Sequence, residues 1–158
     1  MFDSNHAASY AFNPKEIASL MARYYELLAK MRYIPKSSIK YPPHDPAIDL
    51  DVCKKLGLES QVIELLQILP YVEGTGSEDE FILGSSFADF RNVATLEQSR
   101  DPGYADPEEG FDAENGEYVR PWVIVLADCG NHGSIIYLNT KTGKKIAFYC
   151  LSRDKPVN

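Results

Sequence analysis

Apolar residues recur at intervals of three and four near the start of the chain, which is the spacing of one face of an α-helix. A helix is therefore predicted over residues 14–32. Asn13 can cap this helix, Pro14 suits its first position, and Glu16 stands where a capping box needs an acid. The predicted apolar face consists of Ile17, Leu20, Met21, Tyr24, Leu27, Leu28 and Met31.

Two shorter helices are predicted after a proline-rich connector. Residues 33–47 contain four prolines, so we expect an extended stretch that wraps over the domain. A helix follows near residues 50–56, with Asp49 or Asp51 as its cap. A third helix, capped by Ser60, runs to the next proline and is apolar around most of its circumference, so it should lie centrally in the core.

The pattern becomes that of β-structure after residue 71. A short strand is predicted at residues 81–84, and residues 87–90 continue it or pair with it. Residues 91–98 fit either a strand or a helical turn. Residues 122–127 form a run with almost no polar residue, which is typical of a strand covered on both faces.

Two tight turns and two further strands complete the chain, at residues 128–133 (turn), 134–139 (strand), 140–143 (turn) and 145–151 (strand). Gly143 is placed to take a positive φ. Short turns join antiparallel strands, so this part should be a β-meander. Helices precede strands, which predicts an α+β fold with N-terminal helices packed on a mainly antiparallel β-sheet. We expect one domain over residues 1–158, with residues 1–12 a frayed terminus.

The net charge of −7 is concentrated in one stretch. The remaining 16 acids balance the 16 bases, and seven acids without any Lys or Arg lie in residues 101–117. These are Asp101, Asp106, Glu108, Glu109, Asp112, Glu114 and Glu117. Such a stretch repels phosphate backbones, which disfavours nucleic-acid binding, and it could steer a basic protein partner. The predicted loop, residues 99–118, is either this binding surface or a solvated loop without a partner.

One short stretch suggests catalysis. Cys129 and His132 could form a nucleophile and its base, with Asp128 orienting the imidazole. The same residues also suit a hairpin turn, because Gly130 and Asn131 lie between them. Cys129 and His132 supply two ligands where structural zinc needs four, and the calcium-loop ladder of acids is missing. We therefore expect no metal and no cofactor.

Three cysteines, Cys53, Cys129 and Cys150, are an odd number in a chain that is not rich in cysteine. Reduced thiols in the cytoplasm or nucleus fit better than a secreted disulfide scaffold. The start of the chain lacks the basic and apolar regions of a signal peptide, and no apolar run is long enough to span a membrane.

The C-terminal part resembles the SMI1/KNR4 (SUKH) superfamily over about residues 60–150. The resemblance rests on a Pro before a strand (Pro121), a Gly-rich turn (residues 130–133), a strand ending in Asn139, and a Thr-Gly turn (residues 142–143). The helix that ends at Leu69-Pro70-Tyr71 fits loosely, whereas Glu73-Gly74 stands where the family has Asn-Gly. The resemblance implies an α+β fold with a central antiparallel sheet and a non-enzymatic role, as an immunity protein or a signalling adaptor.

Three hypotheses about function follow. The first is a non-enzymatic protein-binding domain whose acidic residues 101–117 meet a basic protein partner. The second is a small enzyme that uses Cys129 and His132. The third is a structural protein that associates with itself, as a homodimer, through its apolar strands and aromatic residues.

Overall fold

The computed structural model describes residues 11–74, 81, 85–100, 119–129, 134–143 and 145–149. The fold is α+β, as predicted, with helices and two antiparallel sheets. The helical elements are α1 (Pro14–Lys30), the 3₁₀ turn η1 (Lys36–Ser38), α2 (Leu50–Lys55), α3 (Ser60–Ile68) and α4 (Val93–Gln98). The strands are β1 (Ile39–Lys40), β2 (Tyr71–Val72), β3 (Ser85–Phe87), β4 (Val123–Cys129), β5 (Ser134–Asn139) and β6 (Lys145–Tyr149).

The first helix begins as its sequence predicts. The Asn13 side chain accepts hydrogen bonds from the backbone N–H groups of Lys15 and Glu16, at 3.1 and 3.3 Å. Tyr25 and Leu28 are buried, but Leu20, Leu27 and Met31 of the predicted apolar face are exposed. The apolar face is therefore wider than the part that the core covers.

The next two helices differ in how they start. Asp49 caps α2, its carboxylate accepting from the N–H groups of Asp51 and Val52. The prediction that Ser60 caps α3 is wrong, because Glu59 precedes the helix and its side chain makes no capping bond. The Glu59 N–H instead donates to the backbone carbonyl of Pro121, at 3.0 Å. As predicted, α3 is central, with Val62, Leu65 and Leu66 at most 1% exposed.

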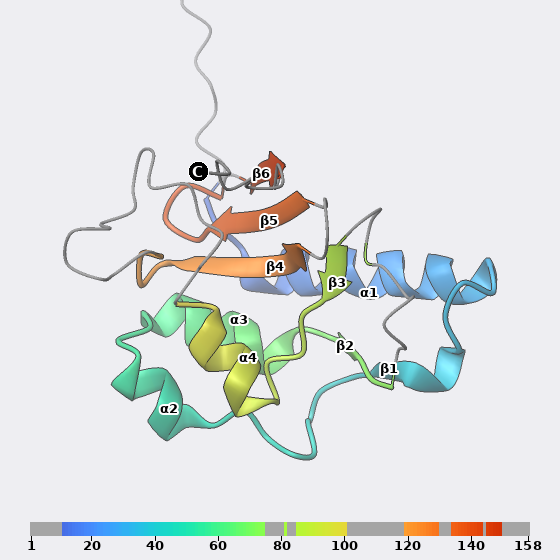
Figure 1. Cartoon of the computed structure of the whole chain (residues 1–158), viewed down its shortest axis with the longest axis horizontal. Helices are drawn as coiled ribbons and strands as arrows, with labels where there is room; N and C mark the ends of the chain where they lie inside the picture. Colours follow the sequence, from blue (N-terminus) through green and yellow to red (C-terminus); the bar gives the residue numbers. More distant parts are fainter. Residues whose placement is uncertain are drawn as a thin grey trace, which may run out of the picture.

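The larger sheet has the strand order β3-β4-β5-β6 and is antiparallel throughout, which confirms the C-terminal meander. Residues 123–127 of β4 are all buried, as expected of a strand covered on both faces. Ile124 and Leu126 pack with α2, α3 and α4, whereas Val123 and Val125 pack with Ile135 and Tyr137 of β5. Figure 1 shows α3 and α4 directly below β4, α2 further from the sheet, and α1 running behind the sheet and past β3.

The tight turn after β5 is confirmed, with Gly143 at φ 66°. The Asn139 side chain accepts hydrogen bonds from the backbone N–H groups of Lys141 and Thr142. The turn predicted at residues 128–133 is wrong at its start. Asp128 and Cys129 belong to β4, where they pair with Ser86 and Ser85 of β3. Residues 130–133 lie outside the described residues.

The region between the two sheets also differs from the prediction. Phe81 is not in a strand: its ring packs among Tyr24, Tyr25 and Phe87, and β3 starts later, at Ser85. The alternatives for residues 91–98 are decided by α4, a helix capped by Asn92. The connector after α1 packs on the core through buried Ile34 and Ile39, but it also contains η1 and β1 and is not extended throughout. None of the described helices is both long and apolar enough to cross a bilayer.

Candidate functional site

The seven predicted binding acids lie in residues 101–117, outside the described part of the chain, but the residues on either side are described. The guanidinium of Arg100 donates through Nη1 to the backbone carbonyl of Val119. Val119 itself is fully buried. The described residues on either side of the acidic segment therefore lie next to each other.

A cluster of cations and one aromatic ring lies close to this place. The Lys141 ammonium lies 3.5 Å from the centre of the Trp122 ring, and the Arg120 guanidinium lies 5.9 Å from it. Lys141 also forms an ion pair with Glu59, at 3.2 Å. The Thr140 hydroxyl donates to the Trp122 backbone carbonyl, at 2.8 Å. These contacts attach Trp122 to the turn after β5, and Lys141 links that turn to Glu59 at the start of α3.

The predicted catalytic residues are only partly placed. The backbones of Asp128 and Cys129 lie in β4, and His132 lies outside the described residues. The pairing of Cys129 with His132 stays a prediction. Cys53 offers no alternative nucleophile, because its side chain is buried and this burial raises the pKa of its thiol.

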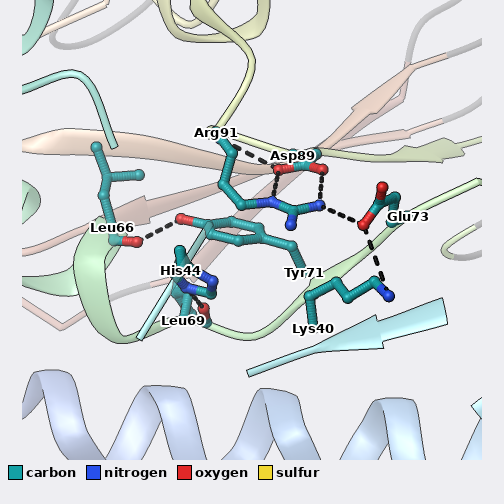
Figure 2. A network of polar contacts seen from close by, with 8 residues as sticks. All are labelled: Lys40, His44, Leu66, Leu69, Tyr71, Glu73, Asp89 and Arg91. Atoms are coloured by element: carbon teal, nitrogen blue, oxygen red, sulfur yellow. Dashed lines mark hydrogen bonds and ion pairs between the residues drawn. The ribbon is translucent and has the colours of Figure 1, made fainter. Parts of the chain in front are cut away.

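A charge network that sequence reasoning missed joins three segments around the buried side chain of Arg91 (Figure 2). Arg91, with a side chain only 6% exposed, donates through Nε and Nη2 to the two carboxylate oxygens of Asp89, at 2.9 and 2.6 Å. Its Nη2 also reaches Glu73, at 3.3 Å, and Glu73 pairs with Lys40 at 3.8 Å. The hydrogen bonds with Asp89 raise the pKa of the Arg91 guanidinium above its ordinary value.

Two aromatic rings lie under this network. The Arg91 guanidinium is 5.9 Å from the centre of the Tyr71 ring, and the His44 ring is 4.8 Å from the same centre. His44 Nε2 lies 2.8 Å from the Leu69 carbonyl, so Nε2 carries the proton and donates. Burial lowers the pKa of His44, and Arg91 acts in the same direction. The imidazole is therefore neutral near pH 7.

This network holds segments together and is not arranged for catalysis. Nε and Nη2 of Arg91 already donate to the carboxylates of Asp89 and Glu73. One ring nitrogen of the neutral His44 donates to a backbone carbonyl. Within the described residues, no group of three or more His, Cys, Asp or Glu side chains could hold a metal ion. The spacing of Asp89 and Arg91 was the only trace of the network in the sequence, because its other members come from distant segments.

Comparisons of the chain with known protein families, with curated proteins and with solved structures find no match. The resemblance to the SMI1/KNR4 superfamily therefore stays a prediction.

Proposed function

We propose that this chain is a non-enzymatic protein-binding domain, of immunity or adaptor type, whose acidic residues 101–117 meet a basic protein partner. One observation carries the proposal: these residues hold the entire net charge of −7, and the rest of the chain is neutral. Charge concentrated in one segment attracts a basic surface at longer range than the same charge dispersed among bases.

The way in which the segment is attached supports this role. Arg100 and Val119, which flank the segment, are hydrogen-bonded to each other, and the contacts of Trp122 hold the residues that follow it. Long loops that start and end at one point of a rigid body commonly carry function. An α+β architecture with an antiparallel sheet is also what the SMI1/KNR4 resemblance implies, and that resemblance implies partner binding without catalysis.

The test compares two triple variants that change the net charge equally. Glu108→Gln/Glu109→Gln/Asp112→Asn removes three charges from the segment, whereas Asp45→Asn/Glu64→Gln/Glu97→Gln removes three exposed charges from elsewhere. A partner captured by the unaltered chain is identified, and its affinity for all three chains is measured by calorimetry. We expect the segment variant to bind at least about tenfold more weakly, and the control variant to bind nearly as well as the unaltered chain.

Salt provides the second measurement. Raising the ionic strength shortens the screening length to about 3 Å at 1 M, so the affinity of the unaltered chain should fall steeply and that of the segment variant only slightly. Equal affinities for the two triple variants would remove the acidic segment from the interface.

The compartment proposed for this role is the cytoplasm or the nucleus. Cys53 is a free, buried thiol, and a reduced thiol is typical of these compartments. Fluorescence microscopy of a tagged chain in its native cell would test this.

A further inference from the structure

Exposed apolar side chains gather on α1 and on the segment that follows it. Seven large apolar side chains are exposed among the described residues, and five of them lie between residues 20 and 41. These are Leu20, Leu27, Met31, Tyr33 and Tyr41, with exposed fractions of 42%, 52%, 65%, 43% and 45%. Together with half-buried Tyr24, the first three are spaced by four, three and four residues, so they form one row along the helix.

A groove lies beside this row. Its volume is about 420 Å³, and it is lined by Leu20, Arg23, Tyr24, Glu26, Leu27 and Lys30. Three of these residues are apolar or aromatic and three are charged. The buried side of α1 packs on the core through Tyr25 and Leu28, and Tyr25 also meets Phe87 of β3. The row with Leu20, Leu27 and Met31 lies on the exposed side of the same helix.

The charges around the groove are mainly positive. Residues 20–41 hold five bases and one acid. The acid, Glu26, accepts a hydrogen bond from the Tyr41 hydroxyl, at 3.1 Å. Arg23, Lys30 and Arg32 are exposed and take part in none of the ion pairs within the described part of the chain. The surface thus combines an apolar row with cations that have no ion-pair partner among the described residues.

We infer that this surface, made of the Leu20–Leu27–Met31 row with Arg23 and Lys30, docks an acidic amphipathic helix of a partner protein. A helix with apolar residues at intervals of three and four would lie along the row, and its carboxylates would face Arg23 and Lys30. The surface is separate from the acidic segment of the proposed function and has the opposite charge. A chain with both surfaces could hold two partners at once.

A second copy of this chain fits the surface less well. Arg23 and Lys30 lie on the same edge of the row, and antiparallel helices related by a two-fold axis bring identical edges together. An antiparallel dimer centred near Leu27 would therefore set Arg23 of one copy against Lys30 of the other. Phosphate-rich ligands would match the cations, but they would leave the exposed Leu and Met side chains without apolar contacts.

The test uses a fluorescent synthetic helix of about five turns with Leu on one face and Glu elsewhere, and follows its anisotropy on titration with the full chain. We expect binding that weakens with salt. Leu27→Ser and Lys30→Glu should each lower the affinity about tenfold. The controls are Leu50→Ser and Lys54→Glu, which alter an exposed leucine and an exposed lysine on α2, and they should leave the affinity unchanged. Circular dichroism of all four variants verifies that they are folded.

Three results would overturn the assignment. One is an absence of binding, and another is equal binding of a peptide with the same composition in scrambled order. The third is a different occupant of the surface. It would be shown by a dimer in sedimentation equilibrium, or by binding to anionic lipid vesicles, if Leu27→Ser abolished that dimer or that binding. The Glu108/Glu109/Asp112 triple variant should bind the synthetic helix as the unaltered chain does, so failure here and failure of the acidic-segment proposal are distinguishable.

Discussion

The Arg91 side chain keeps its charge although only 6% of it is exposed. Moving a guanidinium away from water is costly, and its bonds with Asp89 and Glu73 offset that cost only because the fork of donors matches the carboxylate geometry. The arrangement links β2 to the segment between β3 and α4. The contribution of the Arg91 network to stability therefore depends on the shape of the guanidinium as much as on its charge.

Arg91→Lys should consequently destabilise the protein by roughly 1–3 kcal/mol, because a lysine preserves the charge but cannot bind both oxygens of Asp89 at once. Urea denaturation followed by circular dichroism measures the change. Arg23→Lys, at an exposed position on α1, is the control and should stay within about 0.5 kcal/mol of the unaltered protein. Equal effects at the two positions would contradict a special role for the buried fork.

At the scale of single elements, α1 depends on the side chain that caps it. Asn13→Ala removes the acceptor for two backbone N–H groups and should cost about 1 kcal/mol of unfolding free energy. Asn13→Asp keeps an acceptor at the same place and should cost little. Thermal unfolding of the two variants, side by side, measures this difference. If Asn13→Asp lost as much unfolding free energy as Asn13→Ala, the capping hydrogen bonds would contribute nothing to stability.

Local signals predicted the elements whose ends are set by local chemistry. Asn13 with Pro14 marked the start of α1, Asp49 that of α2, and Gly143 the last described turn. The errors arise where a distant segment decides. Asp128 and Cys129 are in a strand because β3 pairs with them, and Phe81 lies in the core outside any strand because the rings of Tyr24 and Tyr25 surround it.

The candidate sites were less predictable than the elements. The acidic segment is visible in the sequence because its seven charges are contiguous in it. The Arg91 network is not, because Lys40, Glu73 and Asp89 come from separate segments and follow no period. The α1 row was recognised as apolar, but helical spacing alone cannot say which part of a wide apolar face the core covers.

At the scale of the whole molecule, pH should act on stability through the buried tyrosines. Tyr25 and Tyr71 are 1% exposed, and burial raises the pKa of both phenols above the ordinary value of 10.0. The folded state therefore holds these protons more tightly than the unfolded state does. The stabilisation is complete below pH 10 and is lost as the pH rises above it.

Spectrophotometric titration at alkaline pH tests this, because phenolate absorbs where phenol does not. Tyr25 and Tyr71 should ionise only together with loss of the far-ultraviolet dichroism, because burial raises the pKa of both phenols. Tyr25→Phe should remove part of the alkaline instability. Ionisation of all the tyrosines before unfolding would show that these phenols are accessible in the folded state.

The hydrogen bond between Arg100 and Val119 has a consequence for how such a protein can evolve. Because the two ends of the intervening stretch meet, residues 101–118 can be exchanged for a stretch of another length or charge without moving α4 or β4 apart. If the acidic segment binds the partner, as proposed, partner choice could diverge during evolution while the packed body stays the same. On that proposal, a chimaera with a basic stretch between Arg100 and Val119 would bind acidic partners in place of basic ones, on an unaltered packed body.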